Sequence, residues 1–390
     1  MSVGILVGEL AGRGRIALLT DIDFGQQSFG SHSRILAMVK ALSAEAEVDV
    51  LMLQKISPAA LEAARAAAPT ARIIPAEEYA AAASKRRVRR EVSARPAFQG
   101  TRQEAWIGQV AEHLAQRPAT AVIVEYVRLA YLLDGVPPKV LRVLDLHDVM
   151  FQRRLSFAQF GRRPSIVMSR ADEVALIDCF DVAIAITQED AALLAPMLRR
   201  AILVVVPHMG VAVAAAAAER VPGRILFIGA DTQPNRDGLH WFLQQVWPAL
   251  PPRMTLHVAG DISKFVKRLP GGVTALGRIP DVPEFYAGGE VAINPVFYGG
   301  GMKIKTLEAM LHGTPVVTTH EGAKGMAELV GPALRVASGR AAFAGHLLAL
   351  LGDGEALARA RAESRAGVAR LFSAERVMGD LLQVLKVARG

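Results

Sequence analysis

The stretch Val291-Ala-Ile-Asn-Pro-Val-Phe-Tyr-Gly-Gly-Gly-Met-Lys-Ile-Lys-Thr-Leu-Glu-Ala-Met-Leu-His-Gly-Thr-Pro-Val-Val-Thr318 decides the fold of this chain. Residues 291–295 and 315–318 are short apolar runs with the composition of strands that are buried on both faces. Between them, three consecutive glycines precede helix-forming residues, in which Leu307, Met310 and Leu311 are spaced for one apolar face. A strand, a glycine loop, a helix and a second strand form a βαβ unit, which predicts a parallel sheet.

The same alternation of apolar runs and helical patterns extends outward from this unit. In the second half the expected strands are 224–229, 255–259, 273–276, 291–295 and 315–318. In the first half they are 16–21, 48–53, 121–126, 140–144, 182–186 and 202–206, with a helix over 31–42. Residues 207–223 lack periodicity, which is typical of an interdomain connection. We therefore predict an α/β protein with two Rossmann-like doubly wound domains, 1–206 and 224–370, joined by the linker 207–223, with ligands in the cleft between them.

Length and composition agree with this organisation and limit the partners. A chain of 390 residues with 52% hydrophobic residues is long enough for two domains with substantial cores. The net charge of +8 indicates an anionic partner, which could be a phosphorylated substrate, an anionic membrane surface or nucleic acid. Cys179 is the single cysteine, which excludes an intrachain disulfide and fits a reducing cytoplasm. We find no convincing signal peptide, and the apolar stretch 201–218 contains Pro207 and Gly210, so we expect no membrane-spanning helix there.

The helix after the three glycines carries lysines where a helix favours acidic residues. Because a helix N-terminus has partial positive charge, Lys303 and Lys305 in the first turns are unfavourable unless an anion is bound. Phosphate is the usual anion beside a glycine loop. Glu308, about one turn further on, could accept hydrogen bonds from ribose hydroxyls. The alternative is a glycine turn before a solvated helix, because short glycine-rich motifs are weakly specific.

Motifs in both halves resemble one known family. The second half contains Arg-Ile-Leu-Phe-Ile-Gly-Ala at 224–230, Gln-Pro-Asn-Arg-Asp-Gly-Leu at 233–239, Leu-Gly-Arg-Ile-Pro-Asp-Val-Pro-Glu-Phe-Tyr-Ala at 276–287, and the glycine loop followed by His-Gly-Thr-Pro-Val-Val at 312–317. The first half contains Val-Leu-Asp-Leu-His-Asp-Val at 143–149, Ala-Ile-Thr-Gln-Glu-Asp-Ala at 185–191 and Val-Pro-His-Met-Gly at 206–210. Together these motifs resemble the GT-B glycosyltransferases, and among them the retaining family 4 group, in its subgroup with Gly-Gly-Gly loops.

This resemblance implies a fold and an activity. The fold would be GT-B, with an acceptor-binding first domain and a second domain that binds a nucleotide sugar. Residues 371–390 would form a helix that crosses back to the first domain, with Val377, Leu381, Leu382 and Leu385 on its apolar face. The activity would be that of a hexosyltransferase-type enzyme. It would move a sugar from a nucleoside-diphosphate sugar to a glycan or lipid-linked acceptor, with retention of configuration and without a metal or other cofactor.

The resemblance also assigns residues to the donor. Lys303 and Lys305 would stabilise negative charge on the departing nucleoside diphosphate, and Lys305 matches the recurrent basic position of the group. The group carries a pair of glutamates; Glu308 matches the second, which binds ribose, whereas Gly300 stands at the first. Backbone amides would therefore have to meet the donor sugar at this point. The complete donor set is Gly229, Arg236, Ile279, Gly299, Gly300, Gly301, Lys303, Lys305 and Glu308.

The first domain offers a histidine and a glycine-containing loop. His147 follows an expected strand, and it could bond the donor sugar or the acceptor hydroxyl, or handle a proton. Alternatively it is a loop histidine that orients Asp145. The loop 24–34 has the position of the GT-B loop that covers donor phosphate and acceptor, although its sequence would also suit an ordinary turn. The acceptor-side set is Gly25, Gly30, His32, Asp145 and His147.

Two further motifs have weaker functional interpretations. Asp21-Ile-Asp23 has the spacing of a metal-binding DxD motif, but it ends the first strand of a Rossmann pattern, so we expect no metal there. The basic run Lys85-Arg-Arg-Val-Arg-Arg90 could attract anionic lipid head groups, which would place a cytoplasmic protein at the inner face of a membrane, or it could be a solvated surface. Because the run has no interleaved aromatic residues, we do not expect nucleic-acid binding.

Two alternative functions remain open from the sequence. A nucleotide-sugar epimerase can share the two-domain plan and would convert the donor without an acceptor. A catalytically silent glycosyltransferase-like protein would bind a partner or glycan, and the glycine in place of the first glutamate motivates this alternative.

Overall fold

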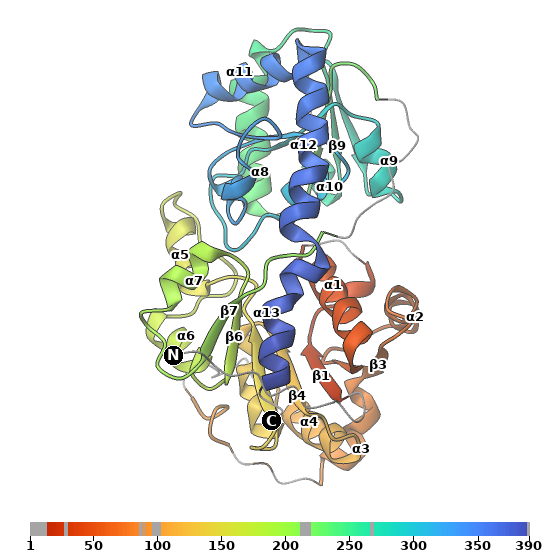
Figure 1. Ribbon diagram of the computed structural model, residues 1–390, viewed down its shortest axis with the longest axis vertical. Coiled ribbons are helices and arrows are strands. Elements are labelled where there is room, and N and C mark those ends of the chain that lie inside the picture. Colours follow the sequence, from red (N-terminus) through yellow and green to blue (C-terminus); the bar gives the residue numbers. More distant parts are fainter. Residues whose placement is uncertain are drawn as a thin grey trace.

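The computed structural model describes residues 14–26, 30–85, 88, 90–95, 103–210, 220–265 and 269–387, with side chains to 385. The chain forms two lobes that lie end to end in Figure 1. Each lobe contains one parallel sheet. The α/β class and the two Rossmann-like sheets predicted from the sequence are confirmed.

The first domain is built on a seven-stranded parallel sheet of order β3-β2-β1-β4-β5-β6-β7. Its strands are β1 (Arg15–Thr20), β2 (Glu47–Met52), β3 (Arg72–Pro75), β4 (Ala121–Glu125), β5 (Leu141–Asp145), β6 (Val182–Ala185) and β7 (Ile202–Val205). Its helices are α1 (Gly30–Glu45), α2 (Pro58–Ala67), α3 (Ala80–Ala83), α4 (Glu104–Gln116), α5 (Met150–Ala158), α6 (Arg170–Ile177) and α7 (Gln188–Leu194). The order of the strands outward from β1 is that of a doubly wound sheet.

The second domain repeats this plan with a six-stranded parallel sheet of order β10-β9-β8-β11-β12-β13. Its strands are β8 (Arg224–Ile228), β9 (Thr255–Ala259), β10 (Val273–Gly277), β11 (Val291–Asn294), β12 (Val316–Thr318) and β13 (Leu334–Val336). Its helices are α8 (Gln233–Trp241), α9 (Val282–Ala287), α10 (Ile304–Leu311), α11 (Arg340–Leu351) and α12 (Gly354–Phe372). The quoted stretch 291–318 is therefore the β11-α10-β12 unit, as the sequence predicts.

Alternate residues of each strand enter cores on opposite faces of its sheet. Ile16 and Leu18 pack with α1 and the last helix, α13 (Ala374–Val387), whereas Ala17 and Leu19 pack with the side of α4 and α6. The second sheet is covered in the same way, and α12 contributes to both of its cores. These strands are apolar on both faces because helices cover both faces of a parallel sheet.

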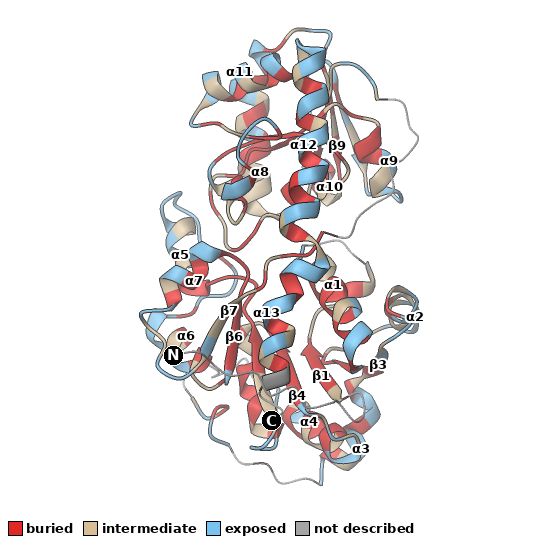
Figure 2. Cartoon of the chain, viewed as in Figure 1, coloured by how far each residue is buried: buried red, intermediate tan, exposed pale blue. Residues whose placement is uncertain are grey.

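The last two helices connect the two lobes. In Figure 1, α12 runs down the second domain and α13 continues onto the first. Val377, Met378, Leu381 and Leu385 of α13 belong to a core cluster of the first domain. Figure 2 shows α13 with buried and exposed residues alternating along it, as expected for a helix with one apolar face.

Short edge strands account for the differences from the sequence prediction. The sequence did not predict β3 or β13, which have four and three residues and are edge strands of their sheets. The helix expected over 31–42 is α1, which begins one residue earlier and extends further.

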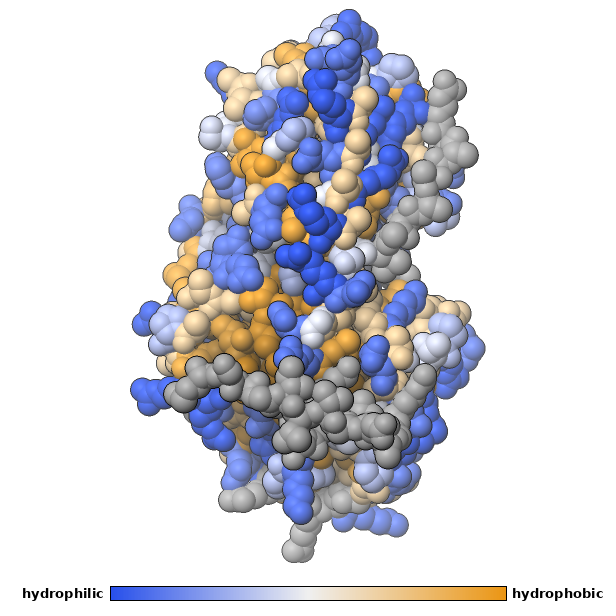
Figure 3. All heavy atoms as spheres, in the orientation of Figure 1, coloured by the Kyte–Doolittle hydropathy of each residue, from blue (hydrophilic) through white to orange (hydrophobic). Residues whose placement is uncertain are grey.

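No helix in the described part of the chain is long and apolar enough to cross a membrane. Figure 3 shows hydrophobic surface on this face just below the waist between the lobes, beside the region where α13 crosses.

Candidate active site

The two sheets present their carboxyl edges to an interdomain cavity of about 530 Å³. The first domain lines it with residues from the start of α1 and the ends of β4 and β5, and the second with residues after β8, β9 and β11. Ligands of open α/β sheets bind in this kind of place. Of the expected site residues, the cavity is lined by Gly30, His147, Gly229, Ile279, Gly299, Gly300, Lys303, Lys305 and Glu308.

Lys305 is a cation inside this cavity without an acidic partner. It lies in the first turn of α10, and its Nζ donates to Asn235 Oδ1 at 2.5 Å and lies 4.8 Å from the centre of the Phe227 ring. No described carboxylate forms an ion pair with it. Burial, together with repulsion from Lys303, lowers the pKa of Lys305 to about 7. A bound anion would relieve this desolvation, so the site is suited to a phosphate group.

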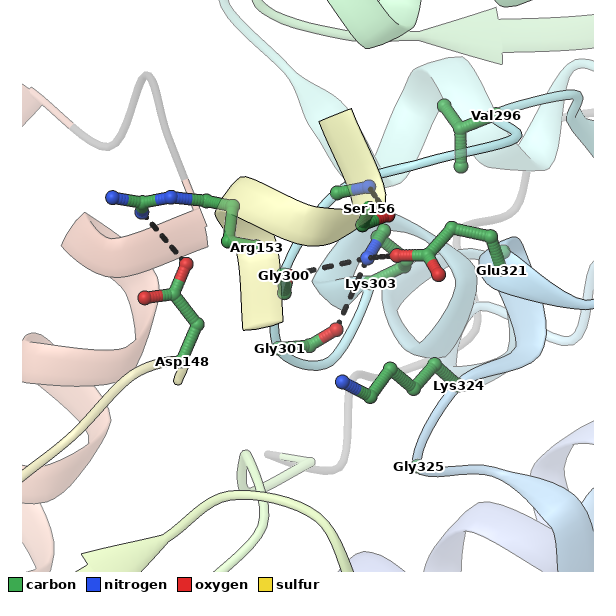
Figure 4. Close-up of polar contacts among 12 residues, drawn as sticks. Asp148, Arg153, Ser156, Val296, Gly300, Gly301, Lys303, Glu321, Lys324 and Gly325 are labelled. Atoms are coloured by element: carbon green, nitrogen blue, oxygen red, sulfur yellow. Dashed lines mark hydrogen bonds and ion pairs between the residues drawn. The ribbon is translucent and has the colours of Figure 1, made fainter. Parts of the chain in front are cut away.

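Lys303 has a different environment, which Figure 4 shows. Its Nζ lies 2.5 Å from Glu321 Oε1, and it also donates to the carbonyl oxygens of Gly300 and Gly301 at 3.2 and 3.1 Å. Its charge is therefore already paired, and its hydrogen bonds hold the glycine loop closed. The sequence prediction treats both lysines as phosphate ligands, whereas the structure leaves Lys305 as the uncompensated charge.

Glu308 lies one turn of α10 beyond Lys305. Tyr286 Oη donates to Glu308 Oε2 over 3.4 Å, and burial raises the pKa of Glu308 to about 7. This carboxyl group lines the cavity and retains acceptor positions for ligand hydroxyls.

The turn after β8 forms the wall opposite α10. Asn235, near the start of α8, donates from Nδ2 to Ala230 O at 2.8 Å and accepts from Lys305, so it joins this turn to the lysine. A side chain at Gly260 would lie 2.3 Å from Gly229 O, so both glycines bring backbone close together here. Ile279 also lines the cavity.

The glycine loop rests against the first domain. A Cβ at Gly301, whose φ is +59°, would lie 2.3 Å from His147 O, and a Cβ at Gly300 would lie 2.5 Å from Asp148 Oδ2. Gly299 N–H donates to Ser156 Oγ of α5 at 3.1 Å. The two domains therefore meet directly at this loop, and only glycine permits this approach.

His147 belongs to a buried polar cluster at the ends of β4 and β5. Its Nε2 lies 2.5 Å from Glu125 Oε2, and its ring stacks on Tyr126 with centroids 4.0 Å apart. Tyr126 and His147 have φ values of +72° and +59°, in the left-handed region that non-glycine residues rarely adopt. Burial and the neighbouring Asp145 raise the pKa of Glu125. Strained backbone of this kind is found mostly at functional sites.

Asp145, which belongs to the same cluster, is fixed by an arginine of α1. The buried Arg34 of α1 donates to both of its carboxylate oxygens, at 2.7 and 2.8 Å. Glu125, Asp145 and His147 lie close enough together to suggest a metal site. However, the Arg34 guanidinium occupies both oxygens of Asp145 and supplies the positive charge, so this cluster does not fit a cation.

Several expected residues lie away from the cavity lining. Arg236 forms an ion pair with Asp231 on the surface and stacks on Phe265, so the structure does not bring it to the cavity. Gly25 packs against the backbone of α2, and His32 is half-buried on α1. Asp21 pairs with Arg128 through two hydrogen bonds.

The basic run 85–90 is described only in part. Lys85 is exposed and Arg90 lies 3.2 Å from Glu104, whereas positions 86, 87 and 89 lie outside the described residues. Contact of this run with a membrane stays a prediction.

Other residues that line the cavity were not selected from the sequence, among them Tyr126, Asp148, Arg153 and Asn235; Arg34, which ends the selected loop 24–34, also lines it. Asn235 lies in the quoted motif 233–239, directly beside the selected Arg236, and helix periodicity would have placed the two on different sides. Tyr126 ends the predicted strand 121–126, and Asp148 follows the predicted strand 140–144 by four residues; a position at the carboxyl end of a strand is the signal that could have found them.

Two ion pairs also join the domains. Arg162 of the first domain pairs with Asp237 of the second at 3.0 and 2.9 Å. In the second pair, Lys324 Nζ of the second domain lies 2.7 Å from Asp190 Oδ1 of the first. The structure is therefore a closed arrangement, in which residues from both domains face one cavity.

The second domain matches a known family. Residues 222–353 match the model of the family described as Glycosyl transferases group 1. A protein of Klebsiella pneumoniae, described as an uncharacterized 44.6 kDa protein in the cps region, is 31% identical over 139 residues, which are 32% of this chain and 36% of that protein. The match thus spans about a third of the relative's length.

Solved structures are similar over nearly the whole chain. Sucrose-phosphate synthase from Thermosynechococcus elongatus superposes with a TM-score of 0.70 at 18% identity, covering 96% of this chain and 100% of that one. TarM superposes with 0.73 at 9% identity over 95% and 98%, and HepE of Anabaena with 0.69 at 14% identity over 96% and 100%. The fold is GT-B, and the resemblance to group 1 glycosyltransferases is confirmed.

Proposed function

We propose that this protein is a glycosyltransferase that moves a sugar from a nucleoside-diphosphate sugar to a hydroxyl group of a glycan or lipid-linked acceptor. The observation that carries the proposal is Lys305, an uncompensated cation at the start of α10 in the interdomain cavity. Two solved neighbours support it, because the Anabaena HepE structures contain UDP-glucose or UDP with glucose. The TarM G117R mutant from S. aureus was solved with UDP, α-GlcNAc-glycerol and Fondaparinux.

In this proposal the second domain holds the nucleotide. Lys305 pairs with the diphosphate, backbone amides of the glycine loop donate to it, and Glu308 accepts from the ribose hydroxyls. Gly229 and the backbone of Ile279 flank the nucleobase. The bond between the anomeric carbon and the β-phosphate oxygen breaks, and a bond from the acceptor oxygen to that carbon forms. Lys305 stabilises the charge that develops on the departing phosphate.

The first domain presents the acceptor on the face of the sugar from which the phosphate departs. His147 lines the cavity, and its ring is fixed by Glu125 and Tyr126 for a hydrogen bond to the sugar or the acceptor. In a retaining front-face reaction the acceptor proton passes to the departing phosphate oxygen, so the chemistry needs no metal and no protein base. Domain contact at the glycine loop excludes water from the donor.

A binding experiment tests the donor site. The melting temperature is measured with ADP, GDP, UDP and CDP and with ADP-glucose, GDP-mannose and UDP-glucose, with and without EDTA. Because a ligand that binds the native state raises the melting temperature, we expect one base to give a shift that survives EDTA. The shift should disappear in Lys305→Met and shrink in Glu308→Ala.

Arg236→Ala is the matched control, since this arginine pairs with Asp231 outside the cavity lining and should leave the shift unchanged. Absence of a shift with every nucleotide would contradict the proposal and leave a silent scaffold. Conversion of the donor without an acceptor would instead identify an epimerase.

A further inference from the structure

Gly300 and Asp148 occupy adjoining space from opposite domains. A Cβ built on Gly300 would lie 2.5 Å from Asp148 Oδ2 and 3.0 Å from Asp148 Cβ and Cγ. The Asp148 carboxylate thus fills the place where a side chain at position 300 would begin. Both residues line the cavity, beside Gly299 and Lys303.

The Asp148 side chain is fixed but incompletely paired. Arg153 Nη1 donates to Oδ2 at 2.7 Å, as Figure 4 shows. Asp148 is 8% exposed, and its Oδ1 has no hydrogen-bond partner among the described residues. A buried carboxylate oxygen without a partner is unfavourable unless a ligand donates to it.

The ligand groups that can reach this place are limited by their neighbours. On one side, Lys305 and the start of α10 would hold the phosphates. On the first domain, His147 and Asp148 are consecutive residues in the segment that follows β5. The sugar would lie between the phosphates and the first domain, and its hydroxyl groups are the donors that a lone carboxylate oxygen lacks.

We propose that Asp148 supplies, from the first domain, the carboxylate that binds a hydroxyl group of the transferred sugar, in place of a side chain at position 300. This inference rests on the proposed function and adds a residue that recognises the sugar. Because Asp148 and the glycine loop belong to different domains, the sugar contact is complete only when the domains are closed. Sugar recognition and domain closure are therefore coupled in this chain.

The first test compares nucleotide with nucleotide sugar. Affinities for UDP and UDP-glucose, GDP and GDP-mannose, and ADP and ADP-glucose are measured by calorimetry for the wild-type protein, Asp148→Ala and Asp148→Asn. Loss of a charge-assisted hydrogen bond should lower the affinity for the nucleotide sugar by roughly 10- to 100-fold. The affinity for the corresponding nucleoside diphosphate should fall by less than about twofold. Asp148→Asn keeps the size of the side chain and an acceptor for Arg153, so it separates lost charge from disturbed packing.

The control is Asp21→Asn, which removes a carboxylate that pairs with Arg128 inside the first domain and outside the cavity lining. It should leave the selectivity for nucleotide sugar over nucleotide unchanged. Equal affinities of wild type and both Asp148 variants for the nucleotide sugar would overturn the inference alone. Equal losses for nucleotide and nucleotide sugar would also overturn it, because they indicate a structural role. Failure of the wild type to bind any of these nucleotides would overturn the proposed function, and the inference with it.

A swap gives the second test. Gly300→Glu alone should lose nucleotide-sugar binding, because its Cβ would meet the Asp148 carboxylate. Asp148→Gly combined with Gly300→Glu frees that space and returns a carboxylate from the other domain. We expect the double variant to bind nucleotide sugar at least about tenfold more tightly than either single variant. A double variant that binds the nucleoside diphosphate normally but shows no such recovery would contradict the inference.

Discussion

At the residue scale, charge compensation separates two lysines that are similar in sequence. Glu321 and two loop carbonyls satisfy Lys303, whereas Lys305 contacts an amide oxygen and an aromatic ring. Desolvation without a counter-ion explains the low pKa of Lys305. The consequence is that ligand binding and protonation should be linked at this position.

We predict that nucleotide-sugar affinity depends on pH through Lys305. Its free pKa is about 7, and a bound diphosphate favours the ammonium form, so the pKa rises on binding. Above the free pKa the complex therefore takes up a proton, and affinity should fall as pH increases, by at most about tenfold per unit. The probe is the nucleotide sugar selected by the melting panel, because its phosphodiester groups stay ionised across the range.

Burial also raises the pKa of Glu308 to about 7. Because an ionised Glu308 binds the ribose hydroxyls more strongly, its titration would make the affinity rise with pH, opposite to the effect of Lys305. The measurement is therefore made by calorimetry in the Glu308→Gln background. Lys303 faces Lys305 but is paired with Glu321. Lys305→Arg in the same background keeps its charge and should give a flat profile. A profile that is equally steep in both would contradict the assignment to Lys305.

At the element scale, the glycine loop between β11 and α10 is shaped by its contact with the other domain. Each strand predicted from the sequence is present to within about two residues. Such runs are readable because buried parallel strands need apolar residues throughout. By contrast, β3 (Arg-Ile-Ile-Pro) and β13 (Leu-Arg-Val) were missed because each is short and contains an arginine, so no continuous apolar run marks it. The three glycines mark a close approach, but nothing local identifies what approaches them.

We predict that Gly301→Ala weakens nucleotide-sugar binding by at least about tenfold, because a 1 Å displacement of the loop disturbs donor alignment. The substitution combines left-handed backbone strain with a Cβ placed 2.3 Å from His147 O. Gly161→Ala is the matched control, since Gly161 has a φ of +64° but nothing within 4 Å of its Cβ position. Calorimetry should show a loss for the first variant and no change for the second. Equal behaviour would mean that contact with His147 does not shape the site.

At the scale of the whole molecule, the chain returns to its first domain through α13. This helix completes one face of the first sheet with the apolar residues expected from the sequence, and α12 belongs to the second domain's cores. The two helices are connected by Ser373, so the domains are linked near this point as well as through the segment that follows β7. The glycine loop and the pairs Arg162–Asp237 and Lys324–Asp190 then hold the closed arrangement.

We predict that Leu381→Ala destabilises the protein by about 2–5 kcal/mol, as expected when a buried leucine is truncated. Leu381 is fully buried against the first sheet. Leu348→Ala on α11, where the residue is 38% exposed, should change stability by less than about 0.5 kcal/mol. Thermal unfolding followed by circular dichroism compares the two. A similar small effect for both would indicate that α13 does not contribute to the core of the first domain.

The sequence by itself determined the two parallel sheets, the glycine loop and the lysines after it, because strand composition, helix periodicity and helix-end charge are local properties. Only the tertiary structure decided that Lys305, and not Lys303, lacks an acidic partner among the described residues. It also decided that Asn235, and not its neighbour Arg236, lines the cavity, and that Asp148 lies against Gly300. The physical reason is that burial and ion pairing depend on groups that are distant in the chain, and here on groups from both domains. Folding brings those groups to the same cavity, and their distances in space cannot be read from their order in the sequence.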